Sequence, residues 1–139
     1  MMYYYMQLLV HRIILMKMIF IVCLGLFYFG QDEKLLDEQA VRAGVDEVCL
    51  WILRSGYRNV IIEINNESDV PKYEHKILQP HRVHELIDQA RSMEHENQRL
   101  LVGTSFTRRE APSPEVVEVS DFILLHGNGV DSPEGIKHM

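Results

Sequence analysis

Polar side chains follow four apolar stretches of the chain, and these are the residues whose types are suited to chemistry. The four groups are Gly30-Gln31-Asp32, Asn65-Asn66-Glu67, Thr104-Ser105 and His126-Gly127-Asn128. In parallel α/β folds, ligands bind outside the carboxyl ends of the strands. If each apolar stretch is a strand of one parallel sheet, the sequence therefore predicts that the four groups converge on a single site.

Glu67 is the candidate catalytic residue of this site. A carboxyl group at a strand end, beside apolar walls, can have a raised pKa and serve as a general acid. Asn66 would hydrogen-bond a substrate hydroxyl next to the reacting atom, and His126 would orient the substrate or hydrogen-bond Glu67. Because side chains alternate along a strand, Glu63, Asn65 and Glu67 are expected on one face. The alternative is that Asn65-Asn66-Glu67 only turns and caps the chain, with His126 in a structural role.

The histidines and cysteines do not predict a metal site. His75, His81 and His84 do not form the H-E-x-x-H pattern, so surface positions are the simpler interpretation. Cys23 and Cys49 sit among apolar residues without metal-type spacing, and both are expected to be buried hydrophobic residues. We therefore expect neither a metal nor a cofactor.

Composition and charge exclude several classes of protein. Of the 139 residues, 47% are hydrophobic and 24% are charged, which suits one core and excludes a disordered chain. The length is too short for a complete eight-stranded βα barrel, which needs at least about 200 residues. The net charge is −6, and residues 1–30 carry +2 (Arg12 and Lys17, no acids), so residues 31–139 carry −8. An acidic body argues against nucleic acid as a partner.

The apolar stretch at residues 13–29 has two interpretations. Its length lies at the lower limit of the 17–25 or so residues that a membrane-spanning helix needs. Arg12 and Lys17 at its start, with acidic residues after it, also fit an uncleaved signal-anchor. Alternatively, residues 18–29, rich in β-branched and aromatic side chains and followed by Gly30, form a strand covered on both faces.

The rest of the chain alternates between strand and helix patterns. Apolar residues recur at steps of four, three and four from Val41 to Ile52, which predicts a helix from Asp37 that ends before Gly56. A second helix is expected with Pro80 in its first turn, and a short one at residues 114–119. Strands are expected at residues 60–64, 100–104 and 122–125. This alternation is typical of βαβ units and favours a first strand at residues 18–29.

Four stretches of the sequence carry a family resemblance. Residues 25–33 (GLFYFGQDE), 56–67 (GYRNVIIEINNE), 80–87 (PHRVHELI) and 121–129 (DFILLHGNG) resemble the middle of cellulase-like glycoside hydrolases. That group is built on a (β/α)8 barrel with a catalytic Asn-Glu pair at the end of strand four. The resemblance covers residues 18–139 and implies an α/β fold that is a partial barrel, strands three to six. Residues 1–17 match nothing in it and form an atypical N-terminal extension.

The resemblance also implies roles for the polar strand ends. Glu67 would be the acid/base, Asn66 would bind the sugar hydroxyl beside the scissile bond, and His126 would line the cleft. The remaining candidate substrate contacts are Asp32, Asn65, Ser105 and Asn128. Retaining enzymes of this type use a second carboxylate about 5–5.5 Å from the first, which in the family ends strand seven and would lie beyond residue 139. The chain alone would then hold the acid/base half of the site and not turn over glycosides.

The expected partner is a carbohydrate, and the resemblance implies a secreted or cell-envelope location. A half-barrel exposes two sheet edges and its inner face, which predicts self-association. Two other functions stay open. One is a membrane-anchored, non-catalytic domain with residues 13–29 as the anchor. The other is a carbohydrate-binding remnant that uses the same cleft without hydrolysis.

Overall fold

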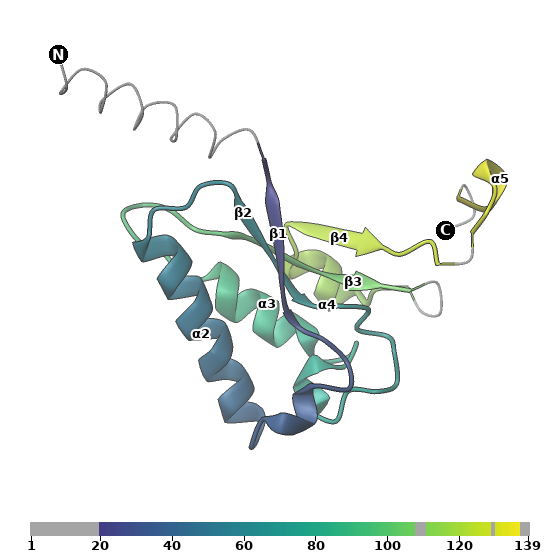
Figure 1. Ribbon diagram of the computed structural model, residues 1–139, viewed down its shortest axis with the longest axis horizontal. Coiled ribbons are helices and arrows are strands. Elements are labelled where there is room, and N and C mark those ends of the chain that lie inside the picture. Colours follow the sequence, from purple (N-terminus) through teal and green to yellow (C-terminus); the bar gives the residue numbers. More distant parts are fainter. Residues whose placement is uncertain (1–19, 108–110, 129, 137–139) are drawn as a thin grey trace, which may run out of the picture.

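The chain folds around one parallel β-sheet of four strands. The computed structural model describes residues 20–107, 111–128 and 130–136. The strands are β1 (Val22–Phe27), β2 (Val60–Asn65), β3 (Leu101–Phe106) and β4 (Phe122–Leu125). They lie side by side in the order of the sequence, and each neighbouring pair is parallel (Figure 1). The predicted α/β fold with parallel strands is therefore confirmed.

Helices connect consecutive strands and cover the same face of the sheet (Figure 1). They are α2 (Glu38–Arg54), α3 (Val83–Arg91) and α4 (Pro114–Val119), and α5 (Pro133–Ile136) follows β4. Two short 3-10 helices, η1 (Asp32–Lys34) and η2 (Lys76–Leu78), lie in the connections after β1 and β2. The sequence pattern predicted neither these two helices nor α5. A helix of three or four residues is too short to show a repeating pattern of apolar residues.

Local capping residues mark the ends of α2 and the start of α4. The side chain of Asp37 accepts a hydrogen bond from the backbone of Ala40 at 2.8 Å, so α2 begins directly after it. Gly56 follows α2 with φ of +70°, a left-handed conformation that suits glycine after a helix end. The short helix at residues 114–119 is confirmed residue for residue, with Ser113 as its N-cap.

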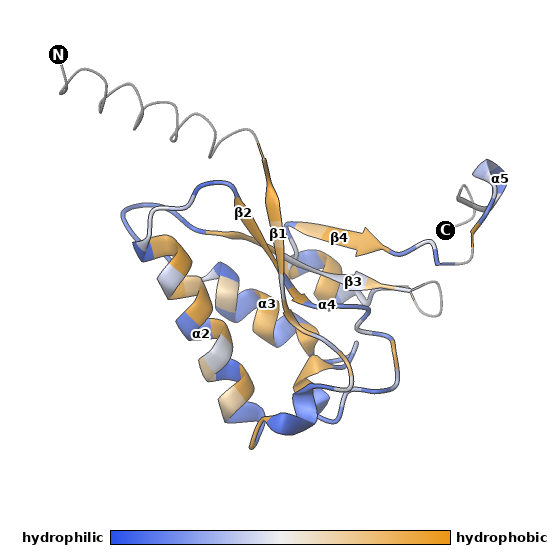
Figure 2. Ribbon diagram, viewed as in Figure 1, coloured by the Kyte–Doolittle hydropathy of each residue, from blue (hydrophilic) through white to orange (hydrophobic). Residues whose placement is uncertain are grey.

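One hydrophobic core of the described residues lies between the sheet and helices α2, α3 and α4. Strands β1, β2 and β4 are mostly hydrophobic, whereas α2 and α3 alternate between hydrophobic and hydrophilic residues (Figure 2). The residues of the core that are not exposed at all come from α2, β2, η2, α3, β3 and α4: Val41, Val45, Cys49, Ile62, Ile64, Ile77, Leu78, Val83, Leu86, Ile87, Ala90, Val102, Phe106 and Val116. This core holds the strand ends at fixed positions relative to one another.

The apolar N-terminal stretch forms a strand where the structure describes it. Val22–Phe27 pairs with β2, with Leu24 opposite Ile62 and Phe27 opposite Asn65. Residues 1–17, taken as an N-terminal extension, and residues 18 and 19 of the predicted strand lie outside the described residues. Within the described ranges, none of the helices has the length and apolar character needed to cross a bilayer. A spanning helix through residues 13–29 does not fit the strand pairing of β1.

Three smaller expectations were wrong. The third strand is shifted from residues 100–104 to Leu101–Phe106. Pro80 lies in the turn before α3, and the regular helix begins at Val83. Cys23 is exposed because it lies on the face of β1 that none of the described helices covers, whereas Cys49 is buried as expected. Burial raises the pKa of the Cys49 thiol to about 11.

The other face of the sheet is uncovered in the described part of the chain. Strand alternation places Cys23, Ile61, Glu63 and Leu101 on this face. Leu101 is 50% exposed, and one carboxylate oxygen of Glu63 is buried without a hydrogen-bond partner. This open face is therefore apolar with one carboxylate near its middle.

Candidate functional site

The backbone at Glu67 leaves the strand in a left-handed conformation. Glu67 follows β2 with φ of +51°, which is uncommon for a residue with a side chain. Its backbone N–H donates to Oγ of Ser105 at 2.7 Å, and the N–H of Ser68 donates to the carbonyl oxygen of Ser105 at 2.8 Å. The end of β3 therefore holds the turn that aims the Glu67 side chain.

Glu67 meets two residues from the chain after β4. Its Oε1 lies 3.0 Å from Nδ1 of His126 and accepts a hydrogen bond from Nδ2 of Asn128 at 2.5 Å. The side chain of Glu67 is 9% exposed and that of His126 is 31% exposed. The predicted contact between His126 and Glu67 is confirmed. Asn128 therefore binds the carboxylate of Glu67 with one N–H of its side-chain amide. A direct contact between Asn128 and a substrate would use the other N–H or the oxygen of this amide.

Both donors hold the same oxygen of Glu67. Oε1 takes the hydrogen bonds from His126 and Asn128, so this oxygen is fixed in place. Oε2 is left outside this pair of hydrogen bonds. A carboxyl group held at one oxygen presents the other in a defined direction, which is the arrangement that proton transfer to or from a ligand requires.

Asn66 lies beside Glu67 with its backbone anchored. Its N–H donates to the carbonyl oxygen of Phe27 at 3.1 Å, and its carbonyl oxygen accepts from the hydroxyl of Tyr73 at 2.6 Å. Burial raises the pKa of the Tyr73 phenol, so its hydroxyl stays protonated and remains a donor. The Asn66 side chain is half-buried and makes no hydrogen bond within the described ranges. It is therefore available to a ligand.

Asn65 has a structural role, and the expectation that it contacts a substrate does not fit this structure. Its side chain is fully buried. Nδ2 donates to the carbonyl oxygen of Leu78 at 2.7 Å, and Oδ1 accepts from the hydroxyls of Ser68 and Thr104, each at 2.8 Å. Because these partners use the amide on both sides, Asn65 ties the loop after β2 to β3.

Asp32 also turns inward, against the expectation of a substrate contact. It is 2% exposed, and its Oδ2 accepts from the backbone N–H groups of Glu74 at 2.8 Å and His75 at 3.1 Å. The ring of His75 lies 3.1 Å from the carbonyl oxygen of Asp32. Asp32 therefore joins the end of β1 to the loop after β2.

Ser105 is a supporting residue of the site. It is fully buried and uses its hydroxyl to accept from the Glu67 backbone, so it positions Glu67 and has no free surface for a substrate. The predicted convergence of the strand ends is thus correct for β2, β3 and β4, whose residues join at Glu67. Asp32, from the polar group after β1, instead binds the backbone of the loop after β2.

Several residues of the supporting structure were not singled out from the sequence. Asp69 accepts from the backbone N–H of Thr107 at 2.7 Å and also from the Thr107 hydroxyl. Ser68 and Tyr73 bind Asn65 and Asn66. The sequence signal for these residues was the high density of small polar residues after β2. That density does not indicate which residues bind one another.

The described ranges hold no group of three or more His, Cys, Asp or Glu side chains placed to bind a metal ion. His75 binds backbone carbonyl oxygens of η1 and Leu35, and His81 is exposed. The polar groups at the strand ends are the carboxylate of Glu67, the imidazole of His126 and the amides of Asn66 and Asn128.

Fold and site together define an α/β chain with a carboxylate held at the carboxyl end of its parallel sheet. Comparison with known protein families, curated proteins and solved structures finds no match for this chain.

Proposed function

We propose that this chain carries the acid/base half of a glycoside-hydrolase site, with Glu67 as the general acid/base and Asn66 as the contact to a sugar hydroxyl. The observation that carries this is the fixed carboxylate of Glu67 beside an unoccupied amide. Glu67 is held through one oxygen by His126 and Asn128. Glycosidic bonds are cleaved by a carboxyl group that protonates the leaving oxygen, assisted by a second carboxylate.

The arrangement of the sheet supports the finer proposal of a partial (β/α)8 barrel that corresponds to strands three to six. In such a barrel, parallel strands follow one another in sequence order, and helices cover only the outer face. A doubly wound sheet instead has helices on both faces and a reversal of strand order. Strand order β1-β2-β3-β4, with α2, α3 and α4 on one face, agrees with the barrel (Figure 1).

Saccharide binding tests the proposed contact of Asn66. Titration of the full chain with a cello-oligosaccharide, followed by calorimetry, is expected to saturate. Asn66→Ala removes the amide that would bind a sugar hydroxyl, so the dissociation constant should rise about tenfold. Gln39→Ala, an exposed position on α2, is the control and should not change binding. Absence of saturation, or equal binding by both variants, would overturn the proposal.

Turnover tests whether the site is only half of the machinery. The full chain should release no reducing sugar from the same oligosaccharide above the background of Glu67→Gln. A clear rate that Glu67→Gln abolishes would show a complete site, and the assignment of half a site would be wrong. Binding without turnover agrees with the proposal and with the carbohydrate-binding alternative, because both use the contact at Asn66.

A further inference from the structure

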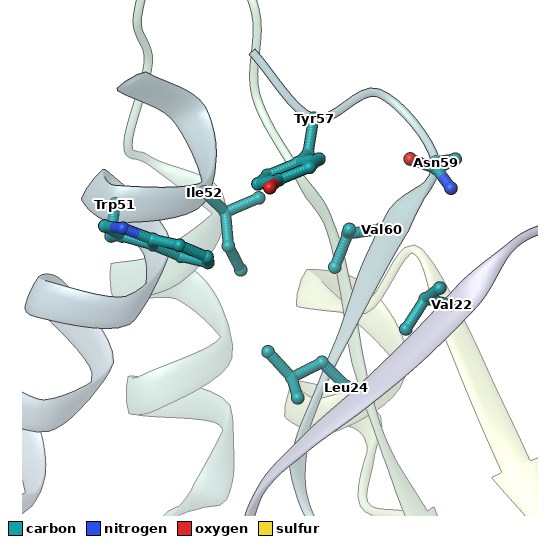
Figure 3. A pocket seen from close by; sticks show the side chains of 7 residues that line it. All are labelled: Val22, Leu24, Trp51, Ile52, Tyr57, Asn59 and Val60. Carbon is teal, nitrogen blue, oxygen red and sulfur yellow. The ribbon is translucent and has the colours of Figure 1, made fainter. Parts of the chain in front are cut away.

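An apolar pocket lies at the other end of the molecule from Glu67. It has a volume of about 270 Å³ and opens between the edge strand β1 and the last turns of α2 (Figure 3). Val22, Leu24 and Val60 form its floor, and the rings of Trp51 and Tyr57 stand at its side (Figure 3). The two ring centroids are 5.7 Å apart.

The lining of this pocket leaves large apolar surfaces open. Trp51 is 60% exposed and Val22 is 46% exposed. Helix α2 contacts α3, and the exposed Trp51 ring shows that the described residues leave part of α2 uncovered. Exposed apolar surface next to a concave pocket costs free energy that an apolar occupant would recover.

The chain enters the sheet at the rim of this pocket. Asn59, which lines the pocket, donates from Nδ2 to the carbonyl oxygen of Phe20 at 2.8 Å and accepts from the N–H of Val22 at 2.8 Å. Phe20, the first described residue, is therefore bound to the rim of the pocket. Phe20 itself is 67% exposed.

We propose that residues 8–16 of this same chain, LLVHRIILM, cover the pocket. Seven of these nine residues are apolar, which matches the apolar lining. Four peptide steps separate Met16 from Phe20 and span at most about 14 Å when extended. The segment is therefore long enough to fold back onto Trp51 and Val22, and short enough to be held near them.

Covalent connection favours this segment over other occupants. A ligand joined by a short linker has an effective concentration in the millimolar range, so it competes well with a free ligand at micromolar concentration. A second copy of the chain or a small apolar molecule would have to displace it. The segment would complete the helix-bearing side of the sheet at the β1 edge, independently of the function of Glu67.

Trp51 reports directly on the pocket because it is the single tryptophan of the sequence. We would measure acrylamide quenching of its fluorescence in the full chain. If residues 8–16 cover the pocket and lower the exposure of Trp51 from 60% to about 20%, the quenching constant should fall roughly threefold, since collisional quenching follows the accessible surface of the ring. Leu9→Asp with Ile13→Asp should restore the higher constant.

A matched double variant, Gln7→Asp with His11→Asp, adds the same two acidic groups at polar positions and should leave Trp51 protected. The wild-type measurement decides the question even if the first variant does not fold. Quenching of the wild-type chain at the level of a 60% exposed ring would overturn the proposal. Protection that disappears on dilution would overturn it as well, because a second copy would then be the occupant.

Discussion

Asn65 connects its own loop to η2 and to strand β3. Its amide binds the carbonyl oxygen of Leu78 and the hydroxyls of Ser68 and Thr104, all without exposure to solvent. A buried polar group that loses its partner costs about 1–3 kcal/mol. Asn65 therefore stabilises the loop that presents Asn66 and Glu67, although it has the residue type of a substrate contact.

Asn65→Ala should lower the free energy of unfolding by about 2–3 kcal/mol, because buried groups on three sides lose their partner. Urea denaturation followed by circular dichroism measures this. Gln39→Ala, exposed on α2, is the control and should stay within about 0.5 kcal/mol of wild type. A loss below that limit for Asn65→Ala would contradict the structural role assigned to this amide.

Two glycines in different elements have opposite expected responses to alanine. At Gly103 in β3, an added Cβ would lie 2.0 Å from the carbonyl oxygen of Phe122, so the β3–β4 pairing must shift. At Gly44 in α2, the Cβ would lie 3.7 Å from the Phe27 ring, an ordinary contact. The close approach at Gly103 explains why a glycine stands in the middle of a buried strand.

Gly103→Ala should destabilise the fold by about 2 kcal/mol or more through overpacking. Gly44→Ala should stabilise it by about 0.5–1 kcal/mol, because alanine favours a helix interior over glycine. Thermal unfolding of both variants checks the pair. Destabilisation by Gly44→Ala would contradict the helix environment described for Gly44, and an unchanged unfolding temperature for Gly103→Ala would contradict the strand spacing at Gly103.

Asp121 fastens the start of β4 to β3. Arg99 donates to both of its carboxylate oxygens, at 2.7 and 2.9 Å, and the N–H of Val102 donates to Oδ2 at 3.0 Å. Burial acts to raise the pKa of Asp121, but these donors outweigh it and hold the pKa below the ordinary 3.8. The folded state therefore favours the ionised carboxylate.

A lowered pKa makes this contribution depend on acid. The stabilisation is present above the ordinary pKa of 3.8 and is lost as the pH falls through the lower pKa of the folded state. Asp121→Asn should cost about 1–2 kcal/mol near neutral pH and reduce the loss of stability below pH 3.8. Urea unfolding between neutral pH and about pH 2 measures both effects. An unchanged acid dependence in Asp121→Asn would refute this role.

For the whole molecule, the sequence predicted what depends on local patterns and missed what depends on distant contacts. The strand and helix order follows from periodicity, and the bounds predicted for α4, residues 114–119, agree with the structure. Alternation failed at Glu67, since a left-handed backbone that depends on Ser105 in β3 ends the strand pattern. The inward turn of Asp32 depends on loop amides about forty residues away.

The open face of the sheet leads to the last prediction, that the chain self-associates through it. Apolar Leu101 is half exposed there, and both β1 and β4 are unpaired edge strands in the described sheet. Because the chain carries a net charge of −6, copies repel one another at low ionic strength, and added salt should strengthen association. Sedimentation velocity over a range of protein and salt concentrations measures this.

A charge on the open face should oppose this association more than a charge elsewhere. Leu101→Lys places an ammonium group on an apolar contact surface, so association should weaken about tenfold or more. Val117→Lys, at a 56% exposed position on α4, adds the same charge on the helix-covered side and should leave association unchanged. If Val117→Lys weakens association as strongly as Leu101→Lys, copies meet through the helices, and the open face must be covered in another way.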